Sequence, residues 1–126
     1  MKLATLTLVL ISVLASASAQ VLFKLGVSAP AIRAALAEAP LSINAMVSLA
    51  RSPAVLGGLL AYALAILLWL GALAELELSV AYPFIGLGVA LTTLMGVLAF
   101  GEPFTATKAF ASVLIVSGIG VLALSS

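Results

Sequence analysis

The chain has 126 residues and a formal net charge of +1, and 65% of its residues are hydrophobic whereas only 7% are charged. This composition excludes an ordinary water-soluble domain and indicates an integral membrane protein. Because the sequence has no His or Cys and its five basic residues are scattered, we expect no metal site, no cofactor, no enzymatic activity and no binding of nucleic acid.

The first apolar segment, residues 3–23, is long enough to cross the hydrocarbon layer of a membrane before Lys24 interrupts it. A secretory signal peptide is the competing interpretation, because the small residues at 15–19 follow an apolar stretch and offer cleavage sites. We expect the segment to remain uncleaved, since apolar residues continue as far as Phe23.

A stripe of polar residues runs along this segment at every fourth position. Successive members turn by about 40° around a helix, so the stripe faces protein or water rather than lipid. Tight helix packing is the alternative to a substrate contact for the serines, and structural hydrogen bonding is the alternative for the amide. The lysine either extends to the lipid headgroups or attracts an anionic group. The stripe consists of Ser12, Ser16, Gln20 and Lys24.

The region from Lys24 to Ser52 is the least hydrophobic part of the chain, and Pro30 and Pro40 interrupt it. It is too broken to span a membrane. Pro30 is placed to open one short helix that ends before Pro40, and residues 41–50 are long enough for a second. We expect an interfacial connector along the membrane surface.

Pro53 is placed to start a second span over residues 54–74, because proline is tolerated in the first turn of a helix. Gly57, Ala61 and Ala65 recur at four-residue spacing within it. Small residues on one face let a neighbouring helix approach closely, so we expect this face to pack against another span.

Two aromatic residues of the second span, Tyr62 and Trp69, lie seven positions apart and therefore on one helix face. Anchoring at the membrane interface is the usual role of such residues. The wall of a binding pocket is the alternative.

The third span, residues 80–100, contains no charged residue. Proline near its start, in the pair Tyr82-Pro83, removes one helical hydrogen bond and leaves a backbone carbonyl that needs another partner. Small residues again recur at every fourth position and predict a packing face. These residues are Gly88, Thr92 and Gly96.

The fourth span covers residues 108–124 and includes Gly118 among its small residues. The pair Glu102-Pro103 ends the third span, because a residue that precedes proline is disfavoured in helical geometry.

The turns between spans two, three and four are short, which predicts an all-α, up-and-down bundle in a single domain of residues 1–126. Four of the five basic residues lie in the connector or beside the 101–107 turn, so we expect both segments to be cytoplasmic and both termini to lie outside; these residues are Lys24, Arg33, Arg51 and Lys108.

Three short motifs occur in order along the chain. Gln20 and Lys24 end the first span, Leu-Ser-Val-Ala-Tyr-Pro occupies 78–83, and Gly-Glu-Pro occupies 101–103. This pattern resembles the drug/metabolite transporter superfamily (EamA-like), and within it the small four-helix subunits of the aminoarabinose-phosphoundecaprenol flippase. The likeness runs from about Leu68 to the C-terminus and includes part of the first span.

The resemblance implies a flippase subunit of the bacterial inner membrane that moves a lipid-linked sugar, carried on polyisoprenyl (undecaprenyl) phosphate. Four-helix relatives that export drugs and guanidinium by proton exchange have a glutamate where this chain has Ser16. Its absence leaves no evident proton carrier within the spans and favours the lipid-carrier branch. The alternatives are an exporter of small polar or cationic solutes, like the small multidrug resistance proteins, and a non-transporting membrane scaffold.

The resemblance also implies that four spans form half of a working unit, so we expect a homodimer, or a heterodimer with a similar subunit. The polyisoprenyl chain would stay in membrane lipid while the headgroup crosses a polar cleft. We expect a substrate pathway of Ser12, Ser16, Gln20, Lys24, Trp69, Tyr82 and Pro83, a gating turn of Glu102 and Pro103, and packing positions at Gly57, Ala61, Gly88, Thr92, Gly96 and Gly118.

Overall fold

The computed structural model describes residues 2–125, and every regular element in that range is a helix. Four helical segments are long and apolar enough to cross a membrane, which confirms the predicted all-α bundle of four spans. Short helices between the first two spans confirm the connector. In chain order the elements are α1 (Leu3–Val27), α2 (Pro30–Glu38), α3 (Ile43–Ala50), α4 (Pro53–Leu73), α5 (Leu78–Ala81), the 3-10 turn η1 (Tyr82–Phe84), α6 (Ile85–Phe100) and α7 (Ala106–Ser125).

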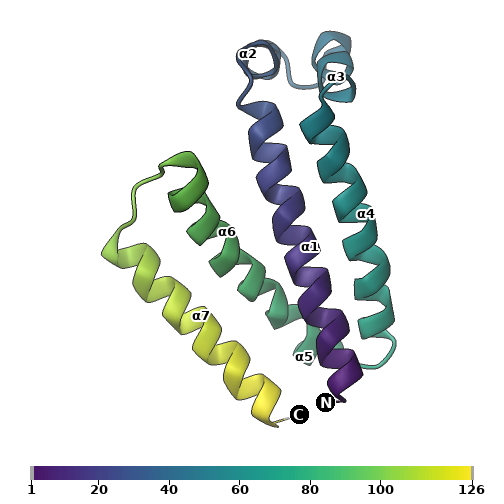
Figure 1. The fold of residues 1–126 in the computed structure, drawn as a ribbon, viewed down its shortest axis with the longest axis vertical. Helices are drawn as coiled ribbons and strands as arrows, with labels where there is room; N and C mark the ends of the chain where they lie inside the picture. The colour runs from purple at the N-terminus through teal and green to yellow at the C-terminus, as the bar shows by residue number, and fades with distance from the viewer. Residues whose placement is uncertain (1, 126) are drawn as a thin grey trace.

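Helices α1 and α4 lie side by side over most of their lengths (Figure 1). Their buried small residues recur at every seventh position, which is two helical turns. Such a repeat keeps one seam of each helix against its partner, as in a coiled coil. The buried residues on this repeat are Thr5, Ser12, Ala19 and Gly26 in α1, and Gly58, Ala65 and Ala72 in α4.

The two helices approach each other closely at Gly58. A Cβ atom there would lie 2.7 Å from two ring carbons of Phe23 and 3.1 Å from the carbonyl oxygen of Ala19. A Cβ atom on Gly57 would make an ordinary contact of 3.6 Å with Leu22. The seam therefore passes through Gly58 and not through the predicted Gly57, but it includes Ala65 of the predicted face, because it follows a period of seven and not of four.

Proline and serine determine the ends of the connector helices. Pro30 begins α2 and Pro53 begins α4, as expected for a residue that lacks a backbone N–H. The Ser42 hydroxyl accepts a hydrogen bond from the Ala45 amide at 3.1 Å, and the Ser52 hydroxyl accepts one from the Val55 amide at 3.3 Å. Both serines thereby satisfy an amide that the first helical turn leaves free.

The third span is a composite of three elements. The helix that starts at Leu78 tightens into a 3-10 turn at Tyr82–Phe84, which contains Pro83, and then continues as α6. Proline cannot donate the hydrogen bond that an α-helix requires there, and a 3-10 turn accommodates it with a small change of geometry. The segment still counts as one membrane-crossing length of 23 residues.

Helices α6 and α7 form a hairpin. Gly101 ends α6 in the left-handed conformation, at φ 65°, which glycine adopts without steric cost. The Thr105 hydroxyl accepts a hydrogen bond from the Lys108 amide at 3.1 Å, so α7 begins two residues before the predicted start. A Cβ atom on Gly86 would lie 2.7 Å from Ile115, which marks a close contact of the hairpin. Gly118 is exposed and has no neighbouring atom within 4 Å of such a position.

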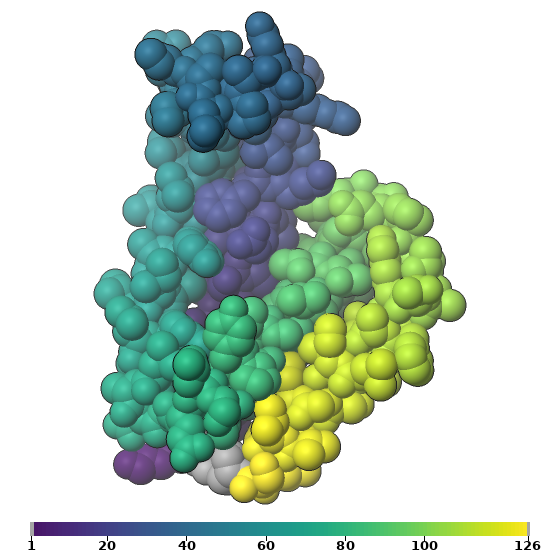
Figure 2. All heavy atoms as spheres, turned by 180° about the vertical axis from the view of Figure 1, so that it is seen from behind, coloured from purple at the N-terminus to yellow at the C-terminus, as the bar shows by residue number. Residues whose placement is uncertain are grey.

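The bundle is closed at one end and open at the other. Phe84, which is 2% exposed, packs in a core of residues from α1, α4 and α7 near the chain ends. From there the α6–α7 hairpin leans away from α1 towards the end that carries α2 and α3 (Figures 1 and 2). We call the end of the bundle near the chain ends the terminal end, and the end that carries α2 and α3 the connector end. We call the line along which α1 faces α6 the α1–α6 seam. The polar cavities described next lie along it.

Candidate functional site

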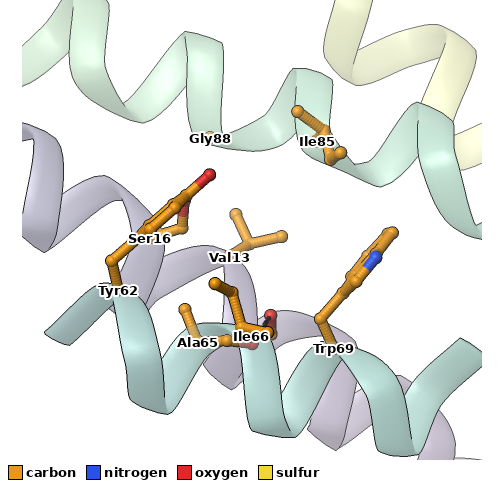
Figure 3. Close-up of a pocket in the computed structure, with 9 residues that line it drawn as sticks. Val13, Ser16, Tyr62, Ala65, Ile66, Trp69, Ile85 and Gly88 are labelled. Atoms are coloured by element: carbon orange, nitrogen blue, oxygen red, sulfur yellow. Dashed lines mark hydrogen bonds between the residues drawn. The ribbon is translucent and has the colours of Figure 1, made fainter. Parts of the chain in front are cut away.

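A small pocket lies between α1, α4 and α6, and we call it the central pocket (Figure 3). Its volume is about 80 Å³. The rings of Tyr62 and Trp69 project from α4 towards α6, with Val13 of α1 between them. Hydroxyls and aromatic rings supply its polarity, and no residue that lines it carries a charge. The lining residues are Ser12, Val13, Ser16, Tyr62, Ala65, Ile66, Trp69, Ile85 and Gly88.

Ser12 and Ser16 have different surroundings in this pocket. Ser12 is 4% exposed, and its hydroxyl donates a 2.9 Å hydrogen bond to the carbonyl oxygen of Ala65, which joins α1 to α4. The Ser16 hydroxyl makes no hydrogen bond within the part of the chain that the structure describes. The Ser12 hydroxyl is therefore engaged in helix packing, while the Ser16 hydroxyl remains available to a ligand.

The aromatic wall is held in place by its neighbours. The rings of Tyr62 and Phe23 meet edge to face with centroids 6.3 Å apart, which favours a fixed ring orientation. Trp69 is half-buried and packs against the core near the terminal end. Both rings line the central pocket, and the choice between a ligand contact and an anchor at the membrane interface stays a prediction.

A second cavity, the connector-end cleft, continues the same seam by one turn of each helix. Its volume is about 170 Å³, and it carries an amide, an ammonium, a hydroxyl and a carboxylate. The predicted pair Gln20 and Lys24 enters from α1, and the predicted small residues Thr92 and Gly96 enter from α6. The lining residues are Gln20, Val21, Lys24, Thr92, Gly96, Phe100 and Glu102.

Two glycines, Gly96 and Gly101, account for the position of the Glu102 carboxylate in this cleft. Gly101 turns the chain back at the end of α6, so that the Glu102 amide donates a 3.1 Å hydrogen bond to the Gly96 carbonyl oxygen. The Glu102 carboxylate then occupies the space that a Cβ atom on Gly96 would fill. Gly96 thus makes room for an acidic side chain, and its role differs from the predicted contact with a neighbouring helix.

Two clefts flank this seam. Lys24 also lines a cleft of about 320 Å³ against α2, together with Ser28 and Arg33. An apolar cleft of about 410 Å³ also lies between α1 and α6, with Leu22 and Met95 in its wall, and it shares Val21 with the connector-end cleft. A basic cleft and an apolar cleft therefore adjoin the connector-end cleft.

Other predicted site residues lie away from these cavities. Tyr82 is 61% exposed in the 3-10 turn near the terminal end, and neither it nor Pro83 lines the central pocket or the connector-end cleft. Pro103 is exposed in the turn, and its carbonyl oxygen accepts a 2.8 Å hydrogen bond from the Lys108 ammonium. Their roles in a pathway or a gate stay predictions.

Comparisons with known proteins place this geometry in context. A family model described as Small Multidrug Resistance protein matches residues 32–115. Uncharacterized protein y4nH of Sinorhizobium fredii is 40% identical over 73 residues, which cover 57% of this chain and 62% of that relative. The chain thus matches less than two thirds of the length of this curated relative. No solved structure matches the chain.

Proposed function

Because the chain belongs to the Small Multidrug Resistance protein family, as the match over residues 32–115 shows, we propose that this multi-pass membrane protein exports small polar or cationic solutes. The sequence resemblance had placed this function second, behind the translocation of a lipid-linked sugar. The family match supports the solute exporter more than the flippase. A bacterial inner membrane is the proposed location.

The observation that carries the proposal is the chemistry of the central pocket. The faces of Tyr62 and Trp69 attract an organic cation through their ring electrons, and the Ser16 hydroxyl is available to accept or donate a hydrogen bond. No basic residue lines the pocket to neutralise a phosphate. Burying either charge without a partner is costly, but the aromatic faces partly compensate a cation and offer nothing to an anion, so this pocket favours a cation over a phosphorylated headgroup.

A dimer is part of the proposal. The central pocket of about 80 Å³ is smaller than the roughly 300–1,000 Å³ of typical ligand sites. Helix α7 exposes large apolar residues such as Phe110, Leu114 and Val121 around Gly118, and it is the least buried of the four spans. A second four-helix subunit, identical or similar, would complete the pocket and cover part of α7.

The test is transport of choline by protein reconstituted in lipid vesicles. We expect saturable movement of labelled choline, and Trp69→Leu should reduce it about tenfold or more because a cation–π contact of up to about 2 kcal/mol is lost. Trp69→Phe is the matched control, since it keeps an aromatic face and should retain most of the activity. Equal rates for these two variants, after correction for the amount in the membrane, would refute the role of the pocket.

Translocation of a lipid-linked sugar is the second candidate function. It is supported by Lys24 and Arg33 in the basic cleft, which suit a phosphate, and by the apolar cleft between α1 and α6, which suits an isoprenyl chain. Vesicles that contain a labelled polyisoprenyl-phosphate sugar distinguish the two candidates. Headgroup movement without choline transport would support the flippase, and choline transport without headgroup movement would support the exporter.

A further inference from the structure

We propose that the connector-end cleft binds the two opposite charges of a zwitterionic solute or headgroup, with Glu102 at its ammonium group and Lys24 at its anionic group. The inference rests on the proposed transport of small polar solutes and narrows their class. It concerns the connector-end cleft, one helical turn along the α1–α6 seam from the central pocket.

Two opposite charges share the connector-end cleft without forming an ion pair with each other. Lys24 and Glu102 both line the cleft, yet their nitrogen and oxygen atoms are not within the 4.0 Å of an ion pair. The ion pair found among residues 2–125 joins Lys2 to Glu75 at 3.8 Å, at the terminal end of the bundle. Each charge in the cleft is therefore available to a ligand.

The Glu102 side chain lies against Gly96 in the last turns of α6, where the helix carbonyls present partial negative charge. An acidic group in that position is disfavoured unless a cation approaches it. Nothing in the described part of the chain supplies that cation within ion-pair distance.

The anionic end of the ligand would meet two basic residues. Lys24 stands between the connector-end cleft and the basic cleft, where Arg33 is the second cation. Two neighbouring cations attract a carboxylate or phosphate more strongly than one. The Gln20 amide, which has no hydrogen-bond partner among residues 2–125, offers both a donor and an acceptor between the two charges.

A ligand with one charge would satisfy half of this arrangement. A simple cation would leave Lys24 facing it with the same sign, and a simple anion would be repelled by Glu102. A zwitterion matches both groups at once. Its positive end can then move along the seam, past Gln20 and Ser16, towards the aromatic wall of the central pocket.

Binding to the full chain in phosphatidylglycerol nanodiscs tests the inference by calorimetry, without relying on transport. The probes are glycine betaine, which carries both charges, choline, which carries the positive charge, and 3,3-dimethylbutanoate, the anion of the same shape as betaine. We expect betaine to bind about tenfold more tightly than either, because each extra charged contact is worth about 1.4 kcal/mol.

Variants separate the two charges. Lys24→Ala should weaken betaine binding about tenfold and improve choline binding, whereas Glu102→Gln should weaken binding of both betaine and choline and improve binding of the anion. The double reversal Lys24→Glu with Glu102→Lys should restore betaine binding. Arg51→Ala, another exposed base at the connector end that lines neither cleft, is the matched control and should change none of the three.

A second set of nanodiscs, which contain phosphatidylethanolamine, distinguishes a lipid headgroup from a free solute as the source of the zwitterion. Competition of this lipid with betaine identifies a lipid headgroup as the ligand, and absence of competition identifies a free solute; both results support the shared chemistry. Equal affinity for betaine and its two singly charged counterparts, or equal effects of Lys24→Ala and Arg51→Ala, would overturn the inference. Betaine binding that shows these charge effects in a protein that does not transport choline would refute the proposed function alone.

Discussion

The contact between α1 and α4 makes a quantitative prediction about two adjacent glycines. A methyl group added at Gly58 would lie 2.7 Å from the Phe23 ring, well inside the 3.4 Å at which ordinary contact begins, and 3.1 Å from the Ala19 backbone oxygen. The ring can rotate, but the backbone oxygen moves only if the helices separate. Overpacking of this kind costs about 1–3 kcal/mol.

Gly57→Ala is the matched control, because the added methyl group would make an ordinary 3.6 Å contact with Leu22. Both substitutions raise helix propensity by the same amount, about 0.5–1 kcal/mol, so this contribution cancels in the comparison. We therefore expect Gly58→Ala to be less stable than Gly57→Ala by about 1–3 kcal/mol.

The assay is unfolding of the detergent-solubilised protein by increasing sodium dodecyl sulfate, followed by the fluorescence of Trp69, the one tryptophan of the chain. The unfolding midpoint of Gly58→Ala should fall below that of Gly57→Ala. Equal midpoints would refute the close contact at Gly58, and a lower midpoint for Gly57→Ala would place the seam at Gly57 instead.

Two further predictions concern the seam between α1, α4 and α6. Ser12→Ala removes the hydrogen bond to α4 and should lower stability by about 0.6 kcal/mol in the same unfolding assay, with transport per folded molecule unchanged; a large loss of transport would assign Ser12 to substrate. Gly96→Ala displaces the Glu102 carboxylate and should weaken betaine binding as Glu102→Gln does, whereas Gly88→Ala, at 3.5 Å from Val13, should leave it unchanged. Equal betaine affinities for the two glycine variants would contradict this account of the cleft.

Local sequence signals are sufficient to predict where most of the helices lie in the chain. Proline at positions 30 and 53 starts α2 and α4, and the apolar lengths give four spans, because these features depend on residues close together in the chain. The start of α7 was predicted at residue 108 and is at Ala106, since the Thr105 cap went unrecognised. Thr105 is a strong N-cap type and was available as a signal.

The packing register could not be read in the same way. The sequence of α4 has small residues on several faces, including Gly57, Gly58 and Ala61, and any of them permits close approach. Only the position of Phe23 on the facing helix decides between Gly57 and Gly58. The packing register thus depends on contacts between segments that are distant in the sequence, and the spacing of small residues within one helix does not determine it.

The candidate site was partly accessible from sequence. The polar stripe drifts around α1 as expected, so that Ser12 faces α4 while Gln20 and Lys24 face the cleft against α6. The position of Glu102 in that cleft was missed, because it depends on how the turn after Gly101 folds back over α6.

The central claim is that the pocket between α1, α4 and α6 binds a small organic cation. The fluorescence of Trp69 reports on that pocket directly, because the chain has no other tryptophan and this one lines the wall. We expect a saturable change in this fluorescence with choline and none with 3,3-dimethylbutan-1-ol, its uncharged counterpart of the same shape. Equal responses to the two compounds, or a response to a polyisoprenyl-phosphate sugar and not to choline, would contradict the claim.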